Sequence, residues 1–157
     1  MAQPWSPQTD HDRAVLLVMR AVRALSDAMD RMHGGMKDDM EMNASDLSAL
    51  RMLIMREQRG EPVSPHDVAH HLRISTASTT KLLDRLSLSG HLERKPHPHD
   101  RRARVVVLTQ ASRDDFYKHF GARLRAMRGV AEGYGDEELK VVARFMAELS
   151  AAIDPPE

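Results

Sequence analysis

The chain has 157 residues, with 23 basic and 23 acidic side chains and no cysteine. This length predicts one domain over residues 1–157. The lack of cysteine excludes disulfides, thiolate nucleophiles and thiolate metal ligands. No apolar run reaches the roughly 18 residues of a membrane helix, and the N-terminal residues do not resemble a secretory signal. We therefore expect no membrane partner and a cytoplasmic location.

The formal net charge of the chain is zero, but its middle segment is cationic. Residues 64–104 carry 8 basic and 4 acidic side chains, net +4, whereas residues 1–63 and 105–157 are each net −2. Six of the nine histidines lie between residues 66 and 99. Such a segment favours a polyanionic partner, although charge alone leaves open a chance cluster on a solvated face.

Apolar residues spaced three and four apart predict a mainly helical fold. We expect a long helix over residues 10–35, ended by Gly34 and Gly35. Asn43 can cap a second helix. The inward-facing residues of this second helix are Leu47, Leu50, Leu53 and Ile54.

Two short helices are expected next, joined by a tight turn. Ser64 followed by Pro65 and Asp67 predicts a capped start for the third helix. Ser75 can cap a fourth helix that ends at Gly90. The turn between these two helices ends at Ser75, so the pair reads as a helix-turn-helix.

Two short strands follow the helix pair. They are predicted over His91–Lys95 and Arg104–Leu108. The second segment contains three consecutive valines, which strongly favour a strand. Pro96 and Pro98 cannot donate ladder hydrogen bonds, so we place both in the loop between the strands. Residues 43–109 therefore predict a winged helix-turn-helix, in a mainly α fold with a small β-wing.

The remaining residues, 110–153, predict two more helices. Thr109 can cap the fifth helix, Gly133 and Gly135 end it, and Asp136 can cap the sixth. The apolar residues of these helices are Phe116, Phe120, Leu124, Met127, Leu139, Val142, Met146, Leu149 and Ile153. A small winged unit cannot cover these faces together with the first helix. We therefore expect N- and C-terminal dimerisation helices that a second subunit buries.

The fourth helix has the length and the polar face to enter the major groove of DNA. Hydroxyl side chains allow a close approach and bind phosphates or base edges, and lysine and arginine add charge. The candidate contacts on this helix are Ser75, Thr76, Ser78, Thr79, Thr80, Lys81 and Arg85. Asp84 is expected to pair with a nearby cation or to face away from DNA.

The predicted wing carries Arg101, Arg102 and Arg104 at or near its tip. An extended arginine-rich loop can enter the minor groove, where negative potential is concentrated. Asp100 is acidic beside these arginines. We expect it to hold an arginine in one rotamer through a bidentate pair.

The segment DRRARVVVLT, residues 100–109, resembles the wing signature of the MarR family of bacterial regulators. That signature is Asp, any residue, Arg, five residues, and Leu-Thr. Residues 74–94 are similar to the family's recognition helix and first wing strand. Helix order and length fit the family over residues 12–153, while the specific motifs lie within residues 63–109.

Two departures from the family pattern stand out. Arg73 occupies the turn between the motif helices, where the family often has glycine. Ala111 and Ser112 follow the Leu-Thr pair, where a glycine is also common. The first departure is expected to alter the turn or to add a phosphate contact.

The resemblance implies a sequence-specific transcriptional regulator, a repressor by default, that binds double-stranded DNA as a homodimer on a palindromic operator. It implies Arg102 as the minor-groove arginine and Asp100 as its holder. It also implies release by a small aromatic or phenolic effector. Five methionines, which could line an effector pocket or belong to the core, surround the first interhelical link: Met29, Met32, Met36, Met40 and Met42.

Other functions are less well supported by the sequence. His66 and His70 have metal-ligand spacing, and His97 and His99 lie on the wing, but no third ligand is fixed nearby. We predict no metal site and no cofactor. We also predict no enzyme, because a Gly-rich phosphate loop, G-x-S-x-G and HExxH are all missing from the sequence. A metal-responsive regulator of the same fold and a winged-helix protein-interaction module remain alternatives.

The clustered histidines suggest a pH effect. Protonation below about pH 6.5 adds positive charge beside the DNA. We expect affinity for DNA to rise as the pH falls from about 7.5 to about 6.

Overall fold

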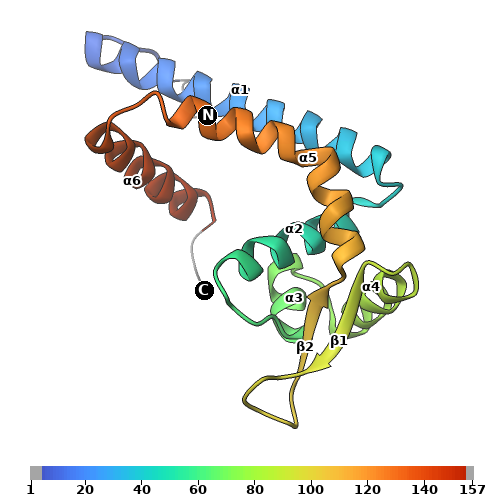
Figure 1. The fold of residues 1–157 in the computed structure, drawn as a ribbon. Helices are drawn as coiled ribbons and strands as arrows, with labels where there is room; N and C mark the ends of the chain where they lie inside the picture. Colours follow the sequence, from blue (N-terminus) through green and yellow to red (C-terminus); the bar gives the residue numbers. More distant parts are fainter. Residues whose placement is uncertain (1–4, 155–157) are drawn as a thin grey trace. The chain divides into compact units, whose positions relative to one another are not determined.

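The computed structural model describes residues 5–154. The chain divides within its fifth helix into two compact units, Met1–Asp115 (unit 1) and Phe116–Glu157 (unit 2). Figure 1 shows helices throughout the described residues and one two-stranded sheet. The predicted fold class, mainly α with a small β-wing, is confirmed.

The first helix, α1 (Asp10–Asp39), is longer than the sequence predicts. Gly34 and Gly35 do not end it, so the predicted end at residue 35 is wrong. A glycine inside a helix costs about 1 kcal/mol relative to alanine, which tertiary burial readily outweighs. Met36, one residue further on, is 0% exposed, so continuing the helix buries its side chain.

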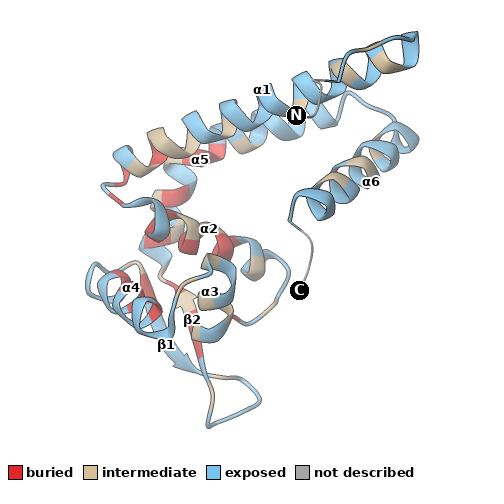
Figure 2. Ribbon diagram, turned by 180° about the vertical axis from the view of Figure 1, so that it is seen from behind, coloured by how far each residue is buried: buried red, intermediate tan, exposed pale blue. Residues whose placement is uncertain are grey.

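The second helix, α2 (Ala44–Gln58), forms the centre of the core. Asn43 caps it as predicted, because its side chain accepts the Asp46 N–H at 2.9 Å. The predicted inward face is confirmed, and Figure 2 shows buried residues along this helix. The buried residues of that face are Leu47, Leu50, Leu53 and Ile54.

The third helix, α3 (Pro65–Leu72), begins with the predicted capping box. The Asp67 N–H donates to the Ser64 hydroxyl at 3.2 Å, and the Ser64 N–H donates to the Asp67 carboxylate at 2.7 Å. Both exchanges satisfy amide groups that have no partner inside the helix. The Ser64 and Asp67 prediction is therefore confirmed.

The turn after α3 depends on a left-handed residue. Arg73 has φ 52° and ψ 44°, a conformation that glycine adopts freely and arginine adopts at a cost of roughly 1–2 kcal/mol. Arg73 therefore does geometrically what the common glycine would do. Ser75 then caps α4 (Thr76–Leu88) as predicted, with its hydroxyl accepting the Ser78 N–H at 3.2 Å.

The two strands of the wing pair antiparallel. They are β1 (Leu92–Pro96) and β2 (Arg104–Leu108), with Leu92 opposite Leu108 and Pro96 opposite Arg104. Pro96 is thus the last strand residue, and its predicted place in the loop is wrong. The missing N–H is tolerated because Pro96 stands at the strand end. On the other side of β2, the Val106 N–H donates to the Val63 carbonyl at 2.7 Å.

Thr109 connects the wing to α5 (Gln110–Ala131) as predicted. Its hydroxyl accepts the Ser112 N–H at 3.1 Å and donates to the Gly90 carbonyl at 2.7 Å. Ser112, at the second departure from the family pattern, is 3% exposed, and its hydroxyl has no hydrogen-bond partner among the described residues.

The last helix, α6 (Asp136–Ile153), starts one residue earlier than predicted. Its cap is Gly135, and Asp136 is already helical. The capping interaction comes from Glu138, whose carboxylate accepts the Gly135 N–H at 2.9 Å. No residue of α6 is buried, so the chain alone leaves the apolar side of this helix open.

Burial differs strongly between the elements. Figure 2 shows the buried residues concentrated in α2, α4, β2 and the first half of α5. Phe116 and Phe120 are buried with their ring centroids 5.3 Å apart, whereas Met127 is 47% exposed. No helix within residues 5–154 is long and apolar enough to cross a membrane.

We expect Ser64→Ala to lower the free energy of unfolding by about 1 kcal/mol, because it removes the cap of α3. Urea denaturation measures this loss. Ser87→Ala, at an exposed serine of α4, is the matched control, with an expected change within about 0.5 kcal/mol. An equal effect of the two substitutions would contradict the capping role.

Candidate nucleic-acid interface

The exposed side of α4 carries short hydroxyls and one lysine. Ser75, Thr76, Ser78, Thr80 and Lys81 are all exposed. Ser75 and Ser78 bond to one another at 3.0 Å through their hydroxyls, and each hydroxyl still has the capacity for a further partner. Five of the seven candidate side chains on this helix therefore remain open to a partner from solvent.

Thr79 does not belong to this surface, and its prediction as a DNA contact is wrong. It is 2% exposed, and its hydroxyl donates to the Ser75 carbonyl at 2.9 Å. Thr79 lies three, four and seven residues before Leu82, Leu83 and Leu86, the buried face of α4. This helical spacing assigns Thr79 to the core, a signal that the sequence contained.

Arg85 forms an ion pair within the fold, so its guanidinium is only partly available, and its contact with DNA stays a prediction. Its Nε and Nη2 donate to the two carboxylate oxygens of Asp46 at 3.0 and 2.6 Å. The Asp46 side chain is only 7% exposed, whereas that of Arg85 is 50% exposed. The hydrogen bonds and charge of Asp46 raise the pKa of Arg85. Their 39-residue separation gave no sequence signal for this pair.

Asp84 pairs with a cation, as expected. Its carboxylate accepts from Arg94 Nη2 at 2.7 Å, which links α4 to the first strand of the wing. This pair also neutralises an acidic group beside the proposed DNA surface. The negative charge of Asp84 is thus matched within unit 1.

The tip of the wing is shaped by Asp100, but not through an arginine side chain. The Asp100 carboxylate accepts the backbone N–H of Arg102 at 2.9 Å, and the Ala103 N–H donates to the Asp100 carbonyl at 3.1 Å. This is an Asx-type turn that fixes the backbone of the loop. The expected bidentate pair between Asp100 and an arginine side chain is therefore wrong. Asp100 instead binds the backbone of the loop.

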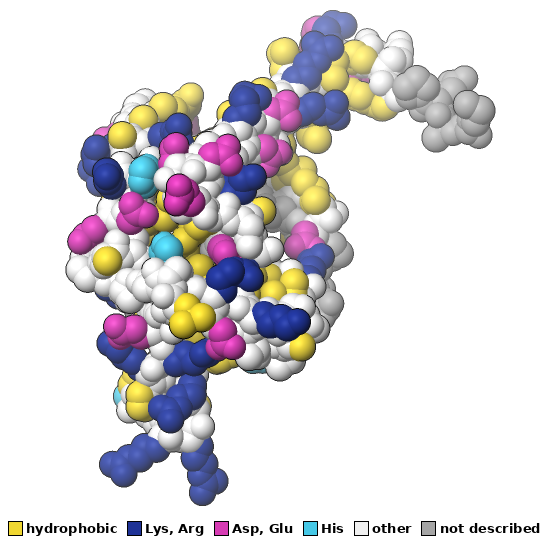
Figure 3. Space-filling view, turned by 90° about the vertical axis from the view of Figure 1, so that its right-hand side faces the viewer, with side chains coloured by type: hydrophobic (Ala, Val, Ile, Leu, Met, Phe, Trp, Pro, Cys, Tyr) yellow, Lys and Arg dark blue, Asp and Glu magenta, His cyan; other side chains and the backbone are white. Residues whose placement is uncertain are grey.

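The arginines of the wing keep their charge available. Arg101, Arg102 and Arg104 are exposed, and none of them forms an ion pair within residues 5–154. Figure 3 shows Lys and Arg side chains projecting at the lower end of the molecule, where Figure 1 places the wing. Unpaired guanidinium groups on an extended ribbon suit a narrow, negative groove.

The histidines do not form a metal centre within the described residues. No group of three or more His, Cys, Asp or Glu side chains there is arranged to hold a metal ion. His97 and His99 instead contact each other edge to face, with ring centroids 6.1 Å apart. Partial burial and the charges of Arg51 and Arg56 lower the pKa of His71.

Unit 1 also contains a cationic cavity that sequence reasoning missed. It has a volume of about 350 Å³, lies between α1 and α2, and is lined by His33, Lys37, Arg51 and Asp30 together with smaller residues. Arg51 Nη1 donates to His33 Nδ1 at 3.3 Å, and partial burial lowers the pKa of Arg51. Among the described residues Arg51 has no carboxylate partner. We call this site the interhelical cavity.

The methionines near this link form core rather than cavity wall. Met36, Met40 and Met42 are at most 9% exposed, and none of the residues that line the interhelical cavity is a methionine. The core alternative therefore holds for these three side chains. The pocket instead has polar walls, formed by residues that are far apart in the sequence.

We expect Arg85→Ala to lower the free energy of unfolding by about 1–3 kcal/mol, because it leaves the buried Asp46 carboxylate without its partner. Urea denaturation measures the change. Arg94→Ala breaks the more exposed pair with Asp84 and should cost about 0–1 kcal/mol. Equal losses would show that burial of Asp46 does not matter.

We expect stability to decrease as the pH falls from about 7.5 to about 5.5, in part through His33. Burial and the charge of Arg51 lower the pKa of His33, although Asp30 opposes them. The unfolded chain therefore binds this proton at a higher pH than the folded chain, so acid favours unfolding. His33→Gln should reduce the pH-dependent loss in urea denaturation. His11→Gln, at an exposed histidine, should leave the loss intact.

Comparison with known proteins agrees with this geometry. A family model described as the MarR family matches residues 42–103. The uncharacterized HTH-type transcriptional regulator YcgE of Bacillus subtilis is 29% identical over 89 residues, covering 57% of this chain and 58% of YcgE. The HTH-type transcriptional repressor YetL of Bacillus subtilis is 24% identical over 98 residues, covering 62% of this chain and 59% of YetL. The match thus spans less than two thirds of these two relatives.

A solved structure shows the same fold. It is a mutant of S. aureus MepR bound to an oligodeoxyribonucleotide, with a TM-score of 0.56 and 14% sequence identity. The alignment covers 87% of this chain and 98% of that chain. The matched proteins are regulators, in agreement with the prediction that the chain is not an enzyme. Residues 42–103, which contain α2, α3, α4 and β1, thus match the MarR family, in agreement with the resemblance of the wing sequence to that family.

Proposed function

We propose that this chain is a sequence-specific DNA-binding transcriptional regulator. One observation carries the proposal: unit 1 presents the hydroxyl-rich side of α4 together with a wing tip whose arginines are unpaired among the described residues. The helix can enter the major groove and the ribbon can enter the minor groove of the same duplex. The oligonucleotide-bound MepR mutant supports this use of the fold.

The division of roles between the residues follows from their surroundings. Ser75, Thr76, Ser78, Thr80 and Lys81 are proposed to meet bases and phosphates of the major groove. The proposed wing contacts are Arg101, Arg102 and Arg104, with Arg102 reaching furthest into the minor groove. Asp100 supports them by holding the backbone at Arg102.

The regulator is proposed to act as a homodimer on a palindromic operator. Apolar side chains are exposed on both terminal regions, as with Leu17 (64% exposed) on α1 and Val142 (50% exposed) on α6. A second copy would remove such surfaces from water through a two-fold contact. Two-fold symmetry would place the two recognition helices about 34–36 Å apart. Repression is proposed because the relative YetL is described as a repressor.

We further propose that a small aromatic or phenolic anion releases the regulator from DNA by binding the interhelical cavity. Arg51 is a partly buried cation without a carboxylate partner among the described residues, and Lys37 and His33 lie beside it. An anion would compensate this charge where water is partly excluded.

A physical connection leads from this cavity to the recognition helix. Leu47 and Ser48 line the cavity, and Asp46 precedes them on the first turns of α2. Asp46 binds Arg85 on α4. A ligand that shifts the start of α2 would therefore pull on α4 through this ion pair.

We expect Arg102→Ala to weaken binding of the selected operator by about 1–3 kcal/mol, because it removes a minor-groove contact. Selection from random duplex DNA identifies the operator, and fluorescence anisotropy at fixed salt measures the dissociation constant. Arg59→Ala, at an exposed arginine of unit 1 outside the interface, is the matched control. It should bind like the unchanged protein.

The same measurements decide between the candidate functions. A regulator selects a palindrome and loses affinity steeply as salt rises. An unchanged constant for Arg102→Ala would contradict the role of the wing. No preference for any duplex, with a shallow salt slope, would instead favour the winged-helix protein-interaction module.

We expect salicylate, used as a probe anion, to bind the interhelical cavity and to lower affinity for the operator. Isothermal titration calorimetry measures binding, and Arg51→Gln should weaken it by about tenfold or more. Arg59→Gln serves as the control, because it removes the same charge at an exposed site. Equal binding by both variants would place the anion elsewhere.

A further inference from the structure

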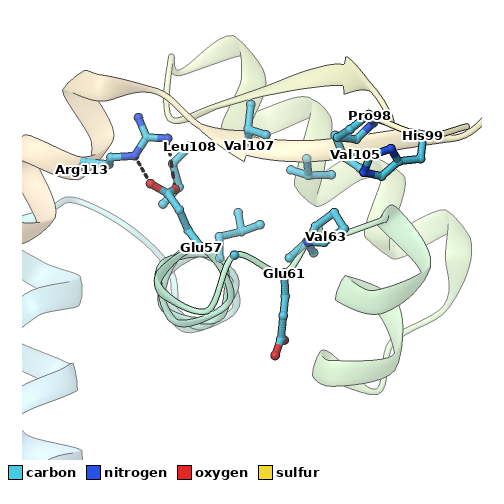
Figure 4. A pocket seen from close by; sticks show the side chains of 13 residues that line it. Glu57, Glu61, Val63, Pro98, His99, Val105, Val107, Leu108 and Arg113 are labelled. Atoms are coloured by element: carbon cyan, nitrogen blue, oxygen red, sulfur yellow. Dashed lines mark hydrogen bonds and ion pairs between the residues drawn. The ribbon is translucent and has the colours of Figure 1, made fainter. Parts of the chain in front are cut away.

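A second cavity of unit 1 lies beside the wing. It has a volume of about 440 Å³ and is bounded by α2, by the α2–α3 connection, by β2 and by the start of α5. We call it the wing cavity. Figure 4 shows Arg113 and Glu57 at one end of it and Pro98 and His99 at the other.

The walls of the wing cavity are mainly apolar. Val63 and Val105 are 3% and 5% exposed, and Leu53 contributes from α2. Volumes of roughly 300–1,000 Å³ with apolar walls and a few polar groups are typical of small-molecule sites. The wing cavity therefore has the size and the surface for a small, largely apolar ligand.

The polar end of the cavity is electrically neutral. Arg113 Nε and Nη2 donate to the two carboxylate oxygens of Glu57 at 2.6 and 3.1 Å. The hydrogen bonds to Glu57 raise the pKa of Arg113. Glu61 points away from the other lining side chains in Figure 4 and pairs with Arg56 at 2.9 Å.

This neutrality selects the chemistry of the ligand. A charged ligand beside this pair would be attracted by one partner and repelled by the other, so the pair offers it no net counter-charge. An uncharged ligand with one hydrogen-bonding group can bind beside the pair without breaking it. The interhelical cavity has the opposite preference, because Lys37 and Arg51 there favour an anion.

The other end of the cavity belongs to the DNA-contacting loop. Pro98 and His99 line the cavity, and the same loop continues through Asp100 to Arg102. The loop is closed by the His97 N–H, which donates to the Ala103 carbonyl at 3.0 Å. A ligand in contact with Pro98 and His99 therefore acts directly on the segment that holds the arginines.

We propose that the wing cavity binds an uncharged, mostly apolar small molecule with one hydrogen-bonding end. We propose also that the bound molecule changes the conformation of the loop that carries Arg101 and Arg102. The ligand-binding part of this proposal depends only on the wing cavity. The effect of the ligand on DNA affinity rests on the proposed function. The site is separate from the interhelical cavity, so the two ligands could bind at once.

The test uses N-phenyl-1-naphthylamine, an uncharged apolar fluorescent probe, with the full chain. We expect saturable binding that Val107→Trp weakens by about tenfold or more, because Val107 lines the cavity. Met55→Trp adds the same ring at a half-exposed residue outside the cavity and should bind the probe like the unchanged protein. Equal binding by the two variants would overturn the assignment.

A measurement on the unchanged protein keeps the test decisive if Val107→Trp fails to fold. In a methyl NMR spectrum with labelled valines, the probe should shift the signals of Val105 and Val107. Shifts confined to exposed valines of α1 and α6, such as Val18 and Val142, would overturn the proposal. Such shifts would place the probe on the apolar helix faces.

A final measurement separates this inference from the proposed function. Operator affinity is measured with and without saturating probe, and we expect it to change by about threefold or more. Duplex binding with a bound probe but an unchanged affinity would overturn the coupling to the loop. Probe binding at Val107 in a protein that selects no duplex would refute the proposed function and uphold the ligand site.

Discussion

The position of α4 depends on a carboxylate that the fold removes from water. Asp46 is 7% exposed at its side chain, and a charge so placed requires a partner with good geometry. Arg85 meets this requirement from α4 with two hydrogen bonds. The apolar row of Leu82, Leu83 and Leu86 fixes which side of α4 faces inward, and the ion pair adds a directional contact at a single point. The opposite side of the helix is left free for a partner.

The wing is secured by contacts of a different kind on each side. Val63 continues the hydrogen bonding beyond β2, Thr109 bonds to Gly90, and Arg94 reaches Asp84 on α4. These contacts hold the strands, while the loop beyond them is shaped by Asp100 alone among the acidic side chains of the wing. A well-held base with a separately shaped tip lets the arginines project without losing their alignment to α4. It also leaves the tip as the part of the wing that a neighbouring ligand can influence.

Local sequence signals predicted most of the fold, because they act over a few residues. The caps at Asn43, Ser64, Ser75 and Thr109 are confirmed, as is the buried face of α2. The end of α1 was missed because burial of Met36 outweighs the glycines before it, a tertiary effect. The candidate site was predicted less well. Thr79 could have been excluded from helical spacing, but the Asp46–Arg85 pair and the interhelical cavity join residues that only the fold brings together.

The left-handed conformation of Arg73 limits how the turn before α4 can evolve. Residues branched at Cβ are strongly disfavoured at a positive φ, whereas glycine and asparagine adopt it readily. A substitution at Arg73 must therefore first be compatible with the positive φ, whatever its effect on ligand or operator binding. Among relatives of this chain, few residue types would be accepted at this position, even where the neighbouring surface differs to recognise new operators.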